Sequence, residues 1–315
     1  MNLSGTAAAI VFATTALSAQ TQPRPVTLVA QVRAAITAHD MAGAEALVAK
    51  QRAERGDSDP ETLEALSWLG RGALGERQLD RAESFAQETR RLTLAALKGK
   101  TVDDDPHLEI ALGASIEVQA QVSAARGERS EAIAFLNKEF ATYGRTKLAK
   151  RIQKNINLLT LEGHPAPPLE GAEFIGTKPP PSLADIKGKI VVMFFWAHWC
   201  PDCKIEGPIL AKMYAKYQSQ GVTIVAPTQR YGYVAGGANA SPGEELKYII
   251  QVREQFYPFL ADLPVPVSVV DHQRYGVSTT PTMVIVDRQG IVRAYHPGRY
   301  TEEELDAQIR ALLGT

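Results

Sequence analysis

The chain has 315 residues, of which 45 % are hydrophobic and 22 % are charged. This length exceeds what one hydrophobic core usually serves, so we expect two domains, each with enough apolar residues to fold. The 34 basic and 35 acidic residues nearly cancel, which argues against nucleic acid or an anionic membrane as the main partner.

The first segment, residues 1–20, has the pattern of a cleavable export signal. Residues 6–19 are small or apolar, and the polar stretch 20–25 follows them. The apolar run is shorter than the roughly 20 residues that a membrane-spanning helix needs. It lacks the usual basic residue ahead of its core, so a mis-started N-terminus is the alternative. The sequence therefore predicts an exported protein, with the periplasm as the expected location.

Residues 26–160 have the composition and periodicity of helices. They are rich in Ala, Leu, Glu, Gln and Arg, which favour helix. Apolar residues recur at spacings of three and four, as at Leu63, Leu66 and Leu69. Pro60 and Pro106 each follow an aspartate and mark helix starts. We predict an all-α domain over residues 26–160.

Three stretches of this helical segment are similar to one another. Residues 39–47, 77–85 and 127–135 each combine a turn with a small residue that lets two helices approach. The middle unit weakly resembles the tetratricopeptide pattern, but the spacing of the units is not constant. Two interpretations stay open: helical hairpins stacked as a short solenoid, which would offer a partner surface, or an ordinary helical bundle.

A proline-rich linker at residues 161–170 separates this segment from one with a different pattern. Proline cannot continue a helix and restricts the residue before it. Beyond the linker, the apolar run 190–196 predicts a buried strand. The further expected elements are a helix at 201–220, a strand at 222–226, a helix at 244–256, a hairpin of strands 282–287 and 291–295, and a helix at 302–313. Residues 167–315 are thus expected to form an α/β domain with a mixed sheet flanked by helices.

The only two cysteines lie three residues apart, in the motif Cys200-Pro201-Asp202-Cys203. Disulfides that serve as a scaffold are usually more numerous and more widely spaced. The motif follows the buried strand and opens a helix, where free N–H groups and the helix dipole stabilise a thiolate at the first cysteine. The sequence predicts a redox-active pair in which one sulfur attacks and the other resolves.

Three other uses of the cysteines are less favoured. A disulfide closing so short a loop contributes less than the ~3 kcal/mol expected for a 15-residue loop. A metal site would need further ligands, and no second cysteine pair or close histidine pair supplies them. A peroxidatic cysteine would follow a Thr or Ser by three residues, whereas this chain has Ala197 there.

From about residue 167 to the end, the chain resembles the thioredoxin superfamily, specifically the exported TlpA/ResA-like thiol-disulfide oxidoreductases. The residues that carry this resemblance are 183–189, 194–203 with Glu206 and Pro208, 275–282 and 285–290. The resemblance covers nearly half the chain and implies a thioredoxin-like fold. The helical segment lies outside it.

The resemblance also implies roles for individual residues. Cys200 would be the attacking thiolate and Cys203 would break the mixed disulfide. Glu206, three residues later, would be an acid placed to take the proton of Cys203. Pro281, preceded by Thr280, matches the family's cis-proline, which faces the cysteines and offers backbone groups to an extended substrate.

Other positions near the motif are harder to assign. Trp199 would shape the partner surface by family resemblance. Asp202 adds a negative charge that disfavours a thiolate. His198 is expected to face solvent, with partner contact or tuning of the thiolate as the alternative. His164, His272 and His296 are expected to lie in loops. The glycine-rich stretch 230–243 is expected to be a solvated surface loop, with the border of a substrate surface as the alternative.

The predicted function is an exported thiol-disulfide oxidoreductase that acts on protein dithiols and disulfides, with reduction favoured over oxidation. It would need an external electron donor or acceptor, such as a membrane redox protein. The sequence gives no sign of an organic cofactor, a metal or nucleic acid as partner. The alternative is a redox-inactive interaction module whose helical domain recruits a partner.

Overall fold

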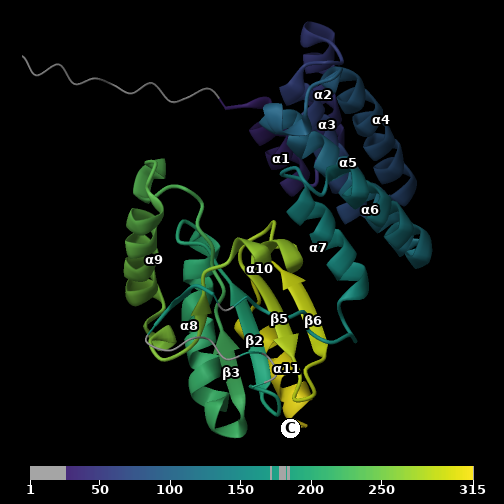
Figure 1. Ribbon diagram of the computed structural model, residues 1–315. Coiled ribbons are helices and arrows are strands. Elements are labelled where there is room, and N and C mark those ends of the chain that lie inside the picture. Colours follow the sequence, from purple (N-terminus) through teal and green to yellow (C-terminus); the bar gives the residue numbers. More distant parts are fainter. Residues whose placement is uncertain (1–25, 171, 177–181, 183–184, 315) are drawn as a thin grey trace, which may run out of the picture.

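The computed structural model describes residues 26–170, 172–176, 182 and 185–314. An all-α region is followed along the chain by an α/β region with a central sheet (Figure 1). The export signal expected at residues 1–20 lies outside the described residues, as do Leu183 and Ala184. No helix in the described ranges has the length and apolar character that crossing a membrane requires.

The N-terminal region is helical, as predicted. Its helices are α1 (Leu28–Thr37), α2 (Met41–Arg55), α3 (Pro60–Gly75), α4 (Leu79–Leu97), α5 (Pro106–Ala125), α6 (Arg129–Tyr143) and α7 (Ala149–Thr160), with the 3-10 turn η1 (Val102–Asp104) before α5. The side chain of Asp59 caps α3 and that of Asp105 caps α5, each directly before a proline. Aspartate accepts the free N–H groups of the first turn, and proline loses nothing there, so both helices begin where the sequence predicted.

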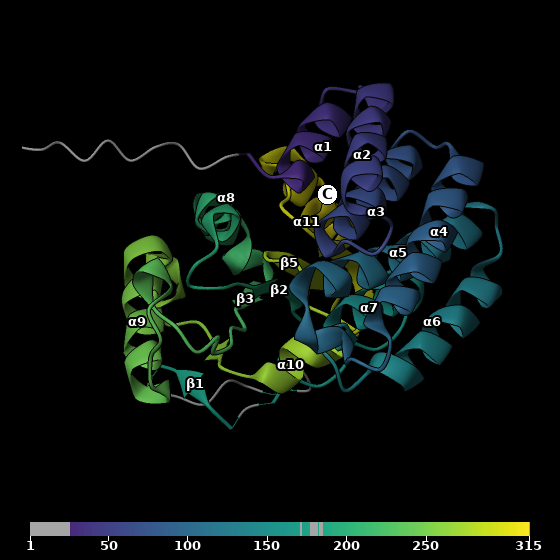
Figure 2. The ribbon, with the colours of Figure 1, turned by 90° about the horizontal axis from the view of Figure 1, so that it is seen from above.

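The helices pack as successive hairpins. α1, α3, α5 and α7 contact one another in that order, while α2, α4 and α6 each pack against the helix before and the helix after them. The core between them is built largely from leucine and alanine, including Leu63, Leu66 and Leu112. Figure 2 shows the hairpins side by side in an arc. The tetratricopeptide resemblance itself stays a prediction.

The C-terminal region has the thioredoxin-like fold. Its four-stranded sheet has the order β3 (Val222–Val225), β2 (Ile190–Phe195), β5 (Thr282–Val286) and β6 (Val292–Pro297). β2 runs parallel to β3 and antiparallel to β5, and β5 and β6 form the predicted hairpin. The helices of this region are α8 (Pro201–Tyr217), α9 (Pro242–Phe256), α10 (Val269–Arg274) and α11 (Glu302–Leu313).

All six residues of β2 are buried because both faces of the sheet are covered. Val192 and Phe194 point into the core that α8, α9 and α11 cover. Val191, Met193 and Phe195 point into the opposite core, which contains Tyr275 and Leu161. A strand buried on both faces shows a continuous apolar run. The turn after β2 places the cysteine motif at the C-terminal end of this strand.

The sequence did not predict the shortest elements. β1 (Phe174–Ile175) and β4 (Val265–Pro266) form a separate antiparallel pair, and α10 has only six residues. The 3-10 turns η2 (Gln218–Gln220), η3 (Ala235–Gly237) and η4 (Pro258–Leu260) were also not predicted. Strands of two residues and turns of three are too short to show a hydrophobic period, and a six-residue helix has fewer than two turns in which to show one.

The proline-rich segment 161–170 is held against the α/β region along much of its length. The Ala166 N–H donates to the Gly290 carbonyl at 2.9 Å, Pro165 pairs with Ile291, and the Tyr275 hydroxyl donates to the Pro167 carbonyl. Leu161 is buried in the core around Phe195 and Tyr275. The helix just before this segment, α7, packs against α10 and β6. The helical region and the α/β region are thus in contact through α7.

Gly276 is the point of closest approach between the regions and gives a stability prediction. Its φ of +62° favours glycine, and a Cβ there would lie 2.3 Å from the Lys154 backbone nitrogen in α7. We expect Gly276→Ala to lower the free energy of unfolding by about 2–4 kcal/mol, through backbone strain and overpacking. The matched control is Gly290→Ala. Gly290 also has a positive φ (+85°), but a Cβ there would have no other atom within 4 Å. Equal losses in guanidinium titrations of the two variants would contradict a tight contact with α7.

Candidate functional site

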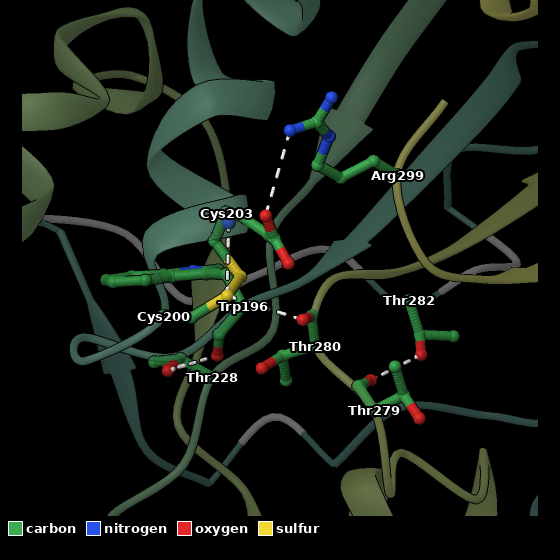
Figure 3. The surroundings of a disulfide bond; sticks show 9 residues. Trp196, Cys200, Cys203, Thr228, Thr279, Thr280, Thr282 and Arg299 are labelled. Carbon is green, nitrogen blue, oxygen red and sulfur yellow. Dashed lines mark hydrogen bonds and ion pairs between the residues drawn. A yellow bond between two sulfur atoms is a disulfide. The ribbon is translucent and has the colours of Figure 1, made fainter. Parts of the chain in front are cut away.

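The two cysteines lie where β2 gives way to α8. Cys200 is the N-cap of α8 and Pro201 opens the helix. The two cysteines form a disulfide with their Cα atoms 5.3 Å apart, and the Cys203 N–H donates to Cys200 Sγ at 3.0 Å (Figure 3). Cys200 is 1 % exposed and Cys203 is fully buried. A helix N-terminus thus faces Cys200 and would stabilise a thiolate there.

The loop before β5 brings Thr280 and Pro281 to the cysteines. The Thr280–Pro281 peptide bond is cis, and the Thr280 carbonyl oxygen lies 3.3 Å from Cys200 Sγ. The Thr282 hydroxyl donates to the Thr279 carbonyl at 2.7 Å and closes the turn (Figure 3). Residues 80 positions apart in the sequence therefore meet at one sulfur atom.

A second loop, after β3, fixes the segment that leads from β2 to Cys200. The Thr228 hydroxyl donates to the Trp196 carbonyl at 2.9 Å (Figure 3), and the Trp196 indole N–H donates to the Ala226 carbonyl at 3.0 Å. Both bonds are buried, so they rigidify the approach to the motif. Thr228 was not predictable from the sequence, because a single threonine after a strand carries no pattern.

Glu206 is buried one turn after Cys203 on α8. Within the described residues neither carboxylate oxygen has a well-formed hydrogen bond. Burial raises the pKa of Glu206 to about 7, against the smaller lowering effects of the Tyr300 backbone and of Arg299. Residues three apart on a helix share a face. A carboxyl group that exchanges its proton near neutral pH is suited to acid–base work.

Asp202 is paired with a residue that the sequence analysis missed. Its carboxylate lies 3.7 Å from Arg299 Nη1, and both groups are partly exposed. The neighbouring Lys204 instead places its Nζ over the Phe256 ring, 4.5 Å from the centroid. Arg299 comes from the turn between β6 and α11, and no motif marks it. An exposed pair of this kind contributes little stability, so it mainly tunes the local charge.

The prediction that His198 faces solvent is wrong. The side chain is fully buried, and its Nε2 lies 3.1 Å from Glu245 Oε1 on α9. The reason is tertiary: residues 231–233 and α9, which are distant in sequence, fold over this position. Burial lowers the pKa of His198, and the hydrogen bond to Glu245 offsets this only in part.

Two of the histidines expected in loops lie in regular elements. His272 belongs to α10 and is buried against Phe195, with Nδ1 3.0 Å from the Ser268 carbonyl oxygen. Burial lowers the pKa of His272 to about 3, so the ring is neutral at physiological pH. His296 lies in β6 and stacks on Tyr300.

The loop at 230–243 borders the motif at its beginning and is mostly exposed further along. The Tyr231 ring centroid lies 5.4 Å from that of Trp199, whose side chain is 44 % exposed. Residues 235–239 are exposed, as expected of a solvated loop. The start of this loop and Trp199 thus form one aromatic surface next to Cys200.

The helical region also reaches this site. Lys150 on α7 donates from Nζ to the Gln229 side-chain oxygen at 2.9 Å, directly after Thr228. Burial lowers the pKa of Lys150. Among the described residues, no group of three or more His, Cys, Asp or Glu side chains is arranged to hold a metal ion.

The α/β region is similar in sequence to known proteins. The family model described as "AhpC/TSA family" matches residues 163–295. The thiol-disulfide oxidoreductase ResA of Geobacillus thermodenitrificans is 30 % identical over 135 residues, which cover 41 % of this chain and 67 % of ResA. The thioredoxin-like protein YneN of Bacillus subtilis is 28 % identical over 152 residues, which cover 47 % of this chain and 78 % of YneN. The crystal structure of a putative thiol:disulfide interchange protein DsbE from Chlorobium tepidum is 30 % identical and covers 49 % of this chain and 98 % of its own, with a TM-score of 0.38.

Proposed function

Because the chain belongs to the ResA-like thiol-disulfide oxidoreductases of the AhpC/TSA family, we propose that it is an exported reductase of protein disulfides that uses Cys200 and Cys203. One observation carries this proposal: Cys200 caps a helix and its sulfur lies against the carbonyl oxygen of the cis Thr280–Pro281 peptide. A nucleophilic sulfur can attack a disulfide of the substrate, and free backbone groups beside it can hydrogen-bond an extended polypeptide.

The proposed reaction begins with both cysteines reduced. The Cys200 thiolate attacks one sulfur of the substrate disulfide, that bond breaks, and one substrate thiolate leaves and takes up a proton. The Cys203 thiolate then attacks Cys200 Sγ and releases the second substrate thiol. Two electrons and two protons pass to the substrate, and the Cys200–Cys203 disulfide remains. Cys200 is the N-cap of α8 and Cys203 lies inside the helix, so we assign the attack on the substrate to Cys200.

We assign the remaining site residues to proton transfer and substrate contact. Glu206 accepts the proton of Cys203 before the resolving step, for which its raised pKa suits it. Trp199 and the Thr280 backbone contact the substrate, since the Trp199 side chain is 44 % exposed and the Thr280 carbonyl oxygen is 3.3 Å from Cys200 Sγ.

The family resemblance favours reduction over oxidation. The charge of Asp202, which Arg299 offsets in part, acts in the same direction, because a negative charge beside the cysteines destabilises the thiolate of the reduced state. An oxidant such as DsbA has the opposite property, a stabilised reduced form. We therefore propose reduction, with electrons from a donor outside the cytoplasm, for example a membrane redox protein.

The helical region, residues 26–160, is proposed as a separate domain that selects the client of the thioredoxin-like domain, residues 167–315. The bond from Lys150 to Gln229 supports this, because it places α7 beside the loop that supports the motif. In the rival view the helical domain recruits a partner and the cysteines are inert.

An assay of the full chain in both directions tests the proposal. We expect it to accelerate the reduction of insulin disulfides by dithiothreitol at least about tenfold, and the oxidised chain to be a poor oxidant of a reduced, unfolded protein. Rapid oxidation of the reduced protein, without acceleration of insulin reduction, would show that the chain is an oxidant and not a reductase. No effect in either assay would favour the inert interaction module.

A further inference from the structure

A buried carboxylate joins three segments around the redox motif. Glu245, on the first turns of α9, is 1 % exposed. It accepts the backbone N–H groups of Tyr231 and Gly232, the latter at 2.8 Å. It also lies 3.1 Å from Nε2 of His198, two residues before Cys200. The sheet-to-helix turn, the loop at 230–243 and α9 are therefore fixed to one another at a single side chain. Figure 1 shows α9 at one side of the α/β region, beside α8.

His198 is held on its other sides by aromatic rings. The ring centroids of Tyr231, Tyr233 and Tyr248 lie 5.3–5.5 Å from that of His198, all in edge-to-face geometry. Within the described residues His198 Nδ1 has no hydrogen-bond partner. Burial lowers the pKa of His198. Burial thus disfavours the charged ring, and the 3.1 Å contact with Glu245 Oε1 favours a proton on Nε2, directed at Glu245.

Glu245 and His198 together determine the position of Tyr231, which lies nearer the surface. Its backbone is fixed by Glu245, its ring packs edge-on against His198, and it packs against Trp199 with 5.4 Å between ring centroids. Trp199 is 44 % exposed although it directly precedes Cys200. The pair Trp199 and Tyr231, here called the aromatic wall, offers an apolar surface beside the attacking sulfur.

We propose that His198 and Glu245 are a buried positioning pair that sets the aromatic wall, and that the wall selects polypeptide disulfides whose cysteine is flanked by an aromatic or branched apolar residue. This inference rests on the proposed function and names the substrate class for the same site. His198 and Glu245 do not touch the reacting sulfurs in the proposed reaction. They act through the placement of Trp199 and Tyr231, which a small disulfide does not need.

The test compares three substrates on the full chain. Two are peptide disulfides identical except for Phe or Ser next to the cysteine, and the third is hydroxyethyl disulfide. For the wild type we expect KM to be about tenfold lower for the Phe peptide than for the Ser peptide, a usual size for one apolar contact. In His198→Phe, which keeps a ring in the cage but lacks the N–H donor, this advantage should fall to about twofold or less. The rate with hydroxyethyl disulfide should stay within about twofold of wild type.

A second variant and a control keep the test independent of stability. Glu245→Gln retains one acceptor oxygen but cannot accept from all three donors, so hydrogen exchange at the Tyr231 and Gly232 amides should quicken about tenfold. Glu254→Gln, an exposed acid on the same helix, should behave as wild type. If the buried variants fail to fold, Tyr231→Ala removes one of the two rings of the aromatic wall and leaves no buried charge unpaired. This variant should lose the preference for the Phe peptide as His198→Phe does.

The outcomes separate this inference from the proposed function. No exchange with any substrate in the wild type would remove the proposed function itself. Normal exchange with an unchanged Phe-to-Ser ratio in the His198, Glu245 and Tyr231 variants would overturn the positioning pair. An equal loss on all three substrates would also overturn it, since selection would then not be what these residues provide.

Discussion

Replacing Cys200 by serine is expected to abolish disulfide exchange, with insulin turnover at least about 10³-fold below wild type. A serine hydroxyl is not ionised near neutral pH and is a far weaker nucleophile toward sulfur than a thiolate. The helix N-terminus and the Thr280 carbonyl would remain in place but would have no attacking sulfur to act on. The measurement is the initial rate of insulin reduction with dithiothreitol.

Cys203→Ser is the matched variant, and its expected result differs in kind. Cys200 can still attack, but nothing displaces the substrate from it, so a mixed disulfide between Cys200 and the client should accumulate. Mass spectrometry after acid quenching would locate it. Full activity in Cys200→Ser, or a mixed disulfide through Cys203 in the wild type, would contradict the assigned order of attack.

The second large effect concerns Glu206. We expect Glu206→Gln to slow the resolving step by about 10²-fold, the lower range of general acid–base catalysis, and to remove an inflection near pH 7 from the pH profile of the wild type. The carboxylate accepts a proton only above its folded pKa, so the wild-type rate should rise with pH through about 7. Stopped-flow decay of the mixed disulfide between pH 5 and 9 measures this.

The same substitution should change stability with a defined sign. Burial places the folded pKa of Glu206 above the ordinary value of about 4.3 for an unfolded chain. The folded state therefore holds the proton longer, and wild-type stability falls as pH rises between about 4.5 and 7. Glu206→Gln lacks this loss, so the oxidised variant should gain about 3–4 kcal/mol on the wild type well above pH 7. An exposed control, Glu303→Gln on α11, should show neither effect, and an inflection that persists in Glu206→Gln would rule out the assignment.

The elements with a strong period were predictable from sequence, and the fold followed from them. The unbroken apolar run of β2 indicated a strand covered on both faces, and the structure places its residues alternately in two cores. The aspartate–proline pairs before α3 and α5 fixed those helix starts. The two-residue strands β1 and β4 and the short α10 leave no such period.

The site was predictable where residues are joined by a motif and not where they meet only in space. Cys200 and Cys203 were identified from their spacing at the strand-to-helix turn, Thr280 and Pro281 through the family resemblance, and the structure brings all four together. Arg299 was missed because it lies about a hundred residues from Asp202, with which it pairs.

His198 shows the limit most clearly. Its solvent-facing prediction came from its immediate neighbours, whereas its burial depends on Glu245, 47 residues away. A buried polar group needs a partner, and a single sequence does not reveal which glutamate supplies it.

The measurement that tests the central claim most directly is the reduction potential of the Cys200–Cys203 pair in the full chain. The protein would be equilibrated in dithiothreitol or glutathione buffers and its free thiols alkylated and counted. A reductase is expected to show a single two-electron transition near thioredoxin's potential of about −270 mV. A transition near about −120 mV would make the protein an oxidant, and the absence of any coupled transition of the two cysteines would contradict a redox function altogether.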